Sequence, residues 1–217
     1  MLLDIAMLLL GVILTAGTFV FVSAEFSPVA LDQAVVESRA AAGDARARQV
    51  STAIKNLSTQ LSGAQVGITL TTILLGYTTQ SALADMLSAA GVGLGLSTAV
   101  SSAVGVAVAA VLINVLSMVF GELVPKNLAL AHPLKTAGRI VPFNSLFTVV
   151  FKPVITVLNA SANGILRLMG VEPQEELSSA RSASELAAMV RHSAQEGTLD
   201  TSTASLFTNS IRISELN

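Results

Sequence analysis

The sequence predicts an all-α integral membrane protein with three transmembrane helices, re-entrant and juxtamembrane amphipathic helices, and the start of a cytosolic helical linker. Three observations predict this fold class. Of the 217 residues, 52% are hydrophobic and only 12% are charged, whereas a soluble domain carries about 25% charged residues. The mean hydropathy is +0.70. Charge-free apolar runs long enough to cross a bilayer recur along the chain.

The composition also argues against several other classes of protein. The formal net charge of −2, without a basic stripe, argues against a nucleic-acid partner. The absence of cysteine excludes disulfides and thiolate metal sites. His132 and His192 lie far apart in the chain and outside the predicted spans, so zinc or copper is not expected. An intramembrane protease would need a nucleophile with a nearby base, so we do not expect an enzyme.

The first predicted span, near 5–24, lies between Asp4 and Glu25. It has no Lys or Arg before it, as a signal peptide would, so we expect it to be retained. The second span, near 60–82, carries a polar stripe at helical spacing, made of Ser62, Gln65, Thr69 and Thr72.

In the second span, Gly63 and Gly67 form a G-x-x-x-G pair, which allows close helix approach in membranes. Residues Asp85–Leu96 contain three glycines and predict a turn or a short re-entrant element. The third span is expected near 98–120.

The remaining segments are expected to lie at or beyond the membrane surface. Segment 29–57 predicts amphipathic helix interrupted at Gly43. Segment 140–169 is interrupted by prolines and charges, so we expect surface-lying or shallow helices there. Residues 1–173 would form the transmembrane domain, and residues 174–217 a linker with a helix near Ser184–Gln195.

The distribution of positive charge predicts the orientation. With these three spans, all twelve Lys and Arg residues fall on one side of the membrane. Positive residues favour the cytoplasmic side. We therefore expect an outside N-terminus and a cytosolic C-terminus, in the plasma (inner) membrane.

The third apolar run ends at a carboxylate followed by a proline. Glu122 is the first charged residue after Asp85, and a charge at the centre of a membrane helix costs at least about 2.5–3.5 kcal/mol. Pro125 lacks an N–H and disfavours helical geometry at Val124 before it. Freed carbonyls beside a carboxylate suit a hard cation. The alternative is a helix that ends at the interface, with Glu122 in water and Lys126 reaching the headgroups.

Three motifs extend this interpretation: S-A-E-F (Ser23–Phe26), L-S-G-A-Q-V-G-I-T-L (Leu61–Leu70) and G-E-L-V-P-K (Gly121–Lys126). Together they resemble the transmembrane domain of the CorC/cyclin M family of magnesium transporters. The segment Ser184–Asn217, with its E-G-T-L and I-S-E-L elements, is similar to the family's linker into a pair of cytosolic CBS domains.

The resemblance implies a three-span homodimer in the lipid bilayer that binds dehydrated Mg²⁺ among its spans and exports it, with Na⁺ as the expected coupling ion. It also implies CBS domains in the full-length protein. Because those domains bind ATP in the family and this chain ends at Asn217, no ATP regulation is expected of the chain itself.

A dehydrated Mg²⁺ takes about six oxygen ligands, so we expect one carboxylate among neutral oxygens. The candidate ligands are the side chains of Ser23, Ser62, Glu122 and Asn127 and backbone carbonyls near Gly67 and Pro125. Gln65, Ser27 and Asn114 are candidates for outer-sphere contacts or for Na⁺. Serine occupies both positions 23 and 27, where the family often has alanine, so the choice of ligand between Ser23 and Ser27 stays open.

Two further expectations complete this interpretation. Three spans are too few to surround an ion and also shield the stripe Ser62–Thr72 from lipid, which favours a homodimer held through its membrane helices. The same Mg²⁺ site would also serve a non-transporting sensor that regulates another transporter, and the sequence does not distinguish this alternative from transport.

Overall fold

The computed structural model describes residues 2–171 and seven isolated positions beyond them, namely 190, 194, 200, 202, 203, 206 and 207. The chain divides into two units, Met1–Gln174 and Glu175–Asn217. The predicted linker helix near Ser184–Gln195 lies outside the described residues, apart from two isolated positions. Every element of the continuously described part is a helix, which confirms the predicted all-α class.

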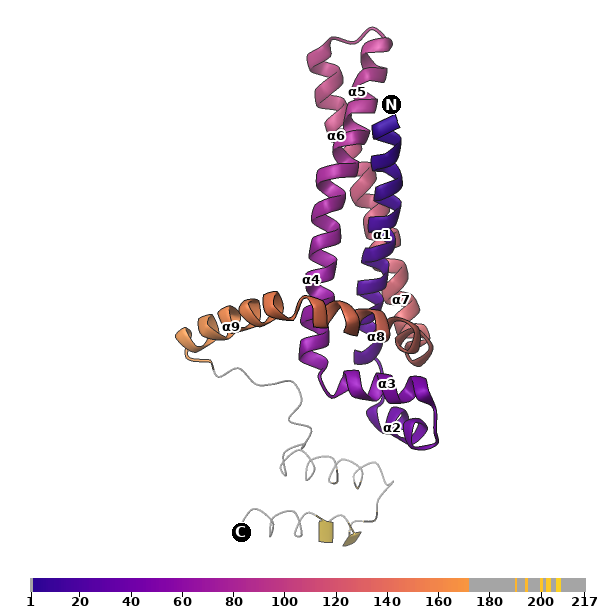
Figure 1. Ribbon diagram of the computed structural model, residues 1–217, viewed down its shortest axis with the longest axis vertical. Helices are drawn as coiled ribbons and strands as arrows, with labels where there is room; N and C mark the ends of the chain where they lie inside the picture. Colours follow the sequence, from indigo (N-terminus) through magenta and orange to yellow (C-terminus); the bar gives the residue numbers. More distant parts are fainter. Residues whose placement is uncertain are drawn as a thin grey trace. The chain divides into compact units, whose positions relative to one another are not determined.

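Three helical runs stand side by side in the first unit (Figure 1). The first is α1 (Leu2–Val29). The second joins α4 (Leu57–Leu75), the short π-helix η1 (Gly76–Gln80) and α5 (Ser81–Gly93). The third joins α6 (Thr98–Leu116), the π-helix η2 (Ser117–Leu123) and α7 (Val124–Ala131).

Within the described residues, Leu2–Val29 and Thr98–Ala131 are long and apolar enough to cross a membrane. The α4–η1–α5 run is not one of these two helices. Its predicted stripe of Ser, Thr and Gln lowers its hydropathy, although it packs along α1 as a spanning helix would. The span between residues 60 and 82 therefore stays a prediction.

Helices α2 (Gln33–Ala41), α3 (Ala45–Ile54) and α8 (Pro133–Val150) lie at the C-terminal end of α1 (Figure 1). Asp32 and Asp44 cap the first two helices, since each carboxylate accepts an amide hydrogen bond from the first turn. The predicted interruption at Gly43 is confirmed, because its φ of +98° suits glycine. A small apolar core joins these helices through Val36, Val50, Ala53, Ile54, Ala137 and Val141.

Segment 140–169 forms the second half of α8 and then α9 (Lys152–Leu168). The two helices are bent by 79° at Phe151, and as a pair they are apolar enough for a third candidate span. Figure 1 shows α8 crossing the upright helices at one end and α9 extending away from them. The surface-lying position of this segment stays a prediction.

The segment Asp85–Leu96, where we expected a turn or a short re-entrant element, contains a turn at its end. Most of this segment is the regular helix α5, which pairs with α6, and only Leu94–Leu96 form the turn, with Gly95 at a φ of +89°. Of the three glycines, Gly91 makes a close helix contact. A Cβ on Gly91 would lie 2.9 Å from the hydroxyl of Ser101, so its absence lets the two helices approach closely.

The G-x-x-x-G pair serves contacts inside one chain. Gly63 faces Thr148 of α8, and Gly67 faces the ring of Phe21 of α1. Both glycines are buried. The pair therefore joins α4 to α1 and α8, and it is not free to form a contact between two copies.

Candidate metal centre in the membrane helices

The three upright runs meet where α1 crosses η2. The hydroxyls of Thr18 and Thr71 lie 2.8 Å apart and join α1 to α4. Gly121 packs on the same threonine, because a Cβ there would lie 3.3 Å from Thr18 Cγ2. Thr18 lies six residues, about 9 Å of helix rise, before Ala24, where the apolar run of α1 ends. Glu122, the residue after Gly121, is therefore carried at a level inside the apolar zone.

The helix that carries Glu122 does not end there, although we expected Pro125 to disfavour helical geometry at Val124. Pro125 is fully buried, and the helix continues to Ala131. The π-helix η2 makes this possible, because its wider turns relieve the clash between a proline ring and the preceding turn. Helical geometry holds at Val124, whose φ is −63° and ψ −51°.

The π-helix nevertheless leaves one carbonyl without its regular donor. The amide of Val124 donates to the carbonyl of Val119, five residues back. The next residue, Pro125, has no amide. The carbonyl of Phe120 therefore loses both the donor of an α-helix and the donor of a π-helix. Phe120 lies two residues before Glu122 in the chain, and the role of carbonyls near Pro125 as metal ligands stays a prediction.

Two of the predicted hydroxyls are buried without a hydrogen-bond partner. Ser23 and Ser27 lie one turn apart on α1 and are fully buried. In the described structure the Oγ atom of neither serine has a hydrogen-bond partner. Leaving a buried hydroxyl unpaired costs about 1–3 kcal/mol. Two such groups on one face of a membrane helix are suited to bind a cation or its water shell.

The other predicted residues divide into two groups. Glu122, Asn127, Gln65 and Asn114 are all exposed on the surface of the single chain. Asn114 donates from Nδ2 to the carbonyl of Ala110 at 2.8 Å. Ser62 and Gly67 are engaged within the chain: the Ser62 hydroxyl donates to Asn159 Oδ1 at 3.1 Å, and Gly67 lies against Phe21. The single chain thus gathers Ser23, Ser27 and Pro125 in its interior and leaves its polar carboxylate and amides outside.

Sequence reasoning did not select Thr18 and Thr71 for the site. The sequence did contain an indication for Thr18, because it shares one helical face with Glu25 in a run that is otherwise apolar. Glu25 was also not selected. It is half-buried and interacts electrostatically with Lys126, whose Nζ lies 4.9 Å from the centre of the Phe26 ring.

In the part of the chain that the structure describes, no three His, Cys, Asp or Glu residues gather into a metal-binding group. A cation bound among these helices would therefore take hydroxyl, amide and carbonyl oxygens, with at most a few carboxylate oxygens. Such donors suit Mg²⁺, Ca²⁺ or Na⁺ and do not suit zinc or copper.

The long apolar helices, with polar groups placed inside their apolar zone, define an integral membrane protein. The chain belongs to the cyclin M transmembrane N-terminal domain family, CNNM, which matches residues 9–203. This match confirms the resemblance to CorC/cyclin M that the three motifs indicated.

Curated relatives agree with this assignment. The chain is 46% identical to the UPF0053 protein MT1890 of Mycobacterium tuberculosis, over 98% of this chain and 47% of the relative. It is 37% identical to the uncharacterized protein Rv1841c of the same species, over 94% of this chain and 58% of the relative. It is 34% identical to the UPF0053 protein YhdT of Bacillus subtilis, over 92% and 43%. The chain thus spans about half the length of the curated relatives it matches.

Proposed function

We propose that this domain transports Mg²⁺ out of the cell, in exchange for Na⁺, through a dehydrated site where α1 meets η2. The observation that most supports this proposal is the pair of buried serine hydroxyls, Ser23 and Ser27, which have no hydrogen-bond partner in the described structure. They lie on a membrane helix that packs against a π-helix and α7. Membership of the cyclin M family supports Mg²⁺ as the cargo.

The chemistry of these groups supports binding that is strong enough to remove water and weak enough to release the ion. Glu122, which is exposed on the single chain, would have to turn inward to supply the one negative charge, and Ser23, Ser27 and the Phe120 carbonyl would supply neutral oxygens. Mg²⁺ requires near-octahedral oxygens at about 2.0–2.1 Å and gives up water reluctantly. A site with one carboxylate offsets part of this dehydration cost without holding the ion permanently.

Export in exchange for Na⁺, rather than sensing, is tested by ion flux. The full-length protein and residues 1–217 would each be reconstituted in vesicles with a Mg²⁺-sensitive dye inside and a Na⁺ gradient imposed. We expect Mg²⁺ movement that follows the Na⁺ gradient and that the Glu122→Gln variant abolishes. If the protein binds Mg²⁺ but produces no flux in either form, the site belongs to a sensor that regulates another transporter.

We further propose that two copies associate through the polar outer face of the single chain. Gln65 on α4 and Asn114 on α6 are exposed, although they belong to apolar helices. Polar groups facing lipid are costly, and a second copy would cover them. Gly63 and Gly67 are occupied within the chain, so the contact would use this polar face instead.

The association is tested by light scattering in a mild detergent at micromolar concentration. We expect the mass of two chains, and we expect Gln65→Leu to shift the protein toward one chain. Ser161→Ala, an exposed change on α9, is the matched control. A mass of one chain for the unaltered protein contradicts the proposal.

A further inference from the structure

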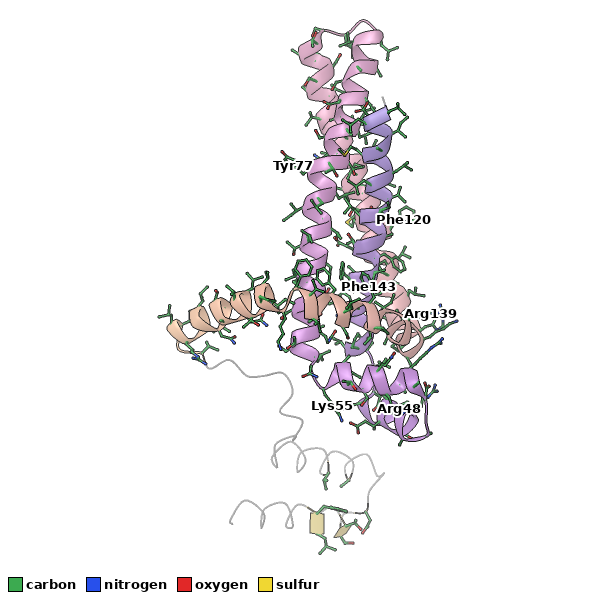
Figure 2. All side chains as sticks on the ribbon, in the orientation of Figure 1. Arg48, Lys55, Tyr77, Phe120, Arg139 and Phe143 are labelled. Carbon is green, nitrogen blue, oxygen red and sulfur yellow. The ribbon has the colours of Figure 1, made fainter. Side chains whose placement is uncertain are left out.

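A basic cavity lies between α1, α7 and α8, at the end of the bundle where α2 and α3 pack. It has a volume of about 200 Å³ and is lined by Phe19, Ser23, Leu128, His132, Lys135, Thr136, Arg139 and Ile140. Lys135 and Arg139 are one helical turn apart on α8, and both are exposed. Figure 2 shows nitrogen-bearing side chains gathered at this end of α8, where Arg139 is labelled.

A second hollow of about 440 Å³ adjoins the first, because His132 and Lys135 line both. Arg39 and Arg46 add two further cations to it. Asp44 carries the single carboxylate among the described residues that line either hollow. Its Oδ1 atom already accepts the amides of Arg46 and Ala47, at 2.9 and 3.2 Å. We refer to the two adjoining hollows together as the groove. It carries four permanent positive charges, on Arg39, Arg46, Lys135 and Arg139, and one carboxylate, which already accepts backbone hydrogen bonds.

The packing of α3 on α8 holds one of these cations in place. Gly138 is buried, and a Cβ there would lie 3.4–3.9 Å from the Cβ, Cγ and Cδ atoms of Arg46. The aliphatic part of Arg46 thus lies across the bare backbone of α8. Arg46 and Lys135 therefore line the same hollow from two different helices.

The first turn of α8 adds donors to the same groove. The first intrahelical hydrogen bond runs from the amide of Thr136 to the carbonyl of His132. The amides of Leu134 and Lys135 precede it and have no acceptor within the helix. Among the described residues, no side chain makes a capping hydrogen bond at this end of the helix. Free amides at a helix N-terminus and the positive end of its dipole favour a phosphate group.

The positive charges of the groove disfavour Mg²⁺, the proposed cargo, and favour an anion. Lys135 and Arg139 repel a divalent cation at the entrance. The inner wall is apolar at Phe19, Leu128 and Ile140 and ends at Ser23, whose buried Oγ has no partner. A groove with cations at its mouth and apolar side chains behind them matches the headgroup and the first carbons of a lipid.

We propose that this groove binds the phosphate headgroup of an anionic phospholipid of the surrounding leaflet. The phosphate contacts Lys135, Arg139, Arg46 and the first-turn amides of α8, and the glycerol enters the cavity between the apolar side chains of Phe19, Leu128 and Ile140. The bound lipid would fasten α3 to α8 at the membrane surface. Glu122 lines neither hollow, although Ser23, which lines the first hollow, is also a proposed Mg²⁺ ligand. Lipid retention can therefore be measured in the absence of Mg²⁺, and its outcome does not depend on Mg²⁺ transport.

The test uses residues 1–217 in phosphatidylcholine nanodiscs, with phosphatidylglycerol added stepwise and retained lipid counted by native mass spectrometry. Each Lys or Arg near an anionic surface changes affinity about fivefold, so Lys135→Gln with Arg139→Gln should weaken phosphatidylglycerol binding about 30-fold. The matched control is Arg48→Gln with Lys55→Gln, which removes the same charge from exposed positions on α3 and at its C-cap, both labelled in Figure 2. Neither residue lines either hollow.

Gly138→Leu provides an independent variant, because it displaces Arg46 without removing a charge, and we expect it to weaken binding about fivefold. Its folding is checked by circular dichroism, and if it does not fold the Lys135/Arg139 variant decides alone. Three results would each overturn the proposal: equal retention of phosphatidylcholine and phosphatidylglycerol, equal loss in the Arg48/Lys55 control, or competition by glycerol 3-phosphate as strong as that by the lipid. In the last case the groove binds a free phosphate compound and not a lipid. Glu122→Gln should leave lipid retention unchanged whether or not it abolishes Mg²⁺ binding.

Discussion

Replacing Gly67 by alanine should destabilise the contact between α4 and α1. The added Cβ would lie 2.5 Å from two ring carbons of Phe21, whereas non-bonded carbons prefer about 3.5–4.0 Å. The ring would have to move by about 1 Å. It has little freedom to do so, because it is 4% exposed and packs edge-on against Phe147, with ring centres 4.7 Å apart. Overpacking of this kind costs about 1–3 kcal/mol.

The measurement is thermal unfolding in detergent, with Gly164→Ala as the matched control. Gly164 is also helical, but a Cβ there would meet nothing within 4 Å. Both substitutions gain the helix propensity of alanine, about 1 kcal/mol, so the difference between the two variants isolates the clash. We expect Gly67→Ala to be less stable than Gly164→Ala by about 1–3 kcal/mol. Phe21→Leu should recover part of this loss in the double variant. Equal stability of the two glycine variants would refute the packing described for Gly67.

Three other substitutions test separate parts of the structure. Asn144→Ala should lower the free energy of unfolding by about 1–3 kcal/mol. Asn144 is 1% exposed, and its Nδ2 donates to the Gln60 carbonyl and to Gln60 Oε1, at 3.1 and 2.9 Å. The control Ser161→Ala should be nearly neutral. Thr71→Val should cost about 1 kcal/mol more than the exposed change Thr69→Val, since Thr71 bonds Thr18; equal effects in urea or thermal unfolding would argue against this hydrogen bond. Pro125→Ala restores an amide near the Phe120 carbonyl, so it should weaken Mg²⁺-dependent stabilisation while the circular dichroism spectrum remains helical; undiminished stabilisation would exclude that carbonyl as a ligand.

Much of the fold follows from hydropathy and helix signals. The caps at Asp32 and Asp44 and the break at Gly43 were readable, because short polar side chains and glycine act locally. The helix through Pro125 was not predictable in the same way. A proline usually disfavours a continuous helix, unless an extra residue widens the turn before it. The π-helix η2 provides that wider turn, but no local residue pattern predicts it.

The candidate site was also predictable from the sequence only in part. Sequence reasoning correctly placed Ser23 and Ser27 near the end of α1, but their burial without partners depends on the packing of α7 and α8, which hydropathy does not reveal. The helical spacing of Gln65, Thr69 and Thr72 shows one polar face, and it does not show whether that face turns inward. In the structure these residues are exposed, while the glycines on the other side of α4 make the close contacts.

The most direct test of the proposed metal centre is Mg²⁺-dependent stabilisation of residues 1–217 and of Glu122→Gln. A ligand at 100 times its dissociation constant stabilises the folded state by about 2.7 kcal/mol, so saturating Mg²⁺ should raise the unfolding midpoint measurably. Asp85→Asn is the matched control, because it removes an exposed carboxylate from the α5–α6 pair, away from the crossing of α1 and η2. We predict that the unaltered protein and Asp85→Asn keep the Mg²⁺ effect and that Glu122→Gln loses it. An undiminished Mg²⁺ effect in Glu122→Gln would contradict the account.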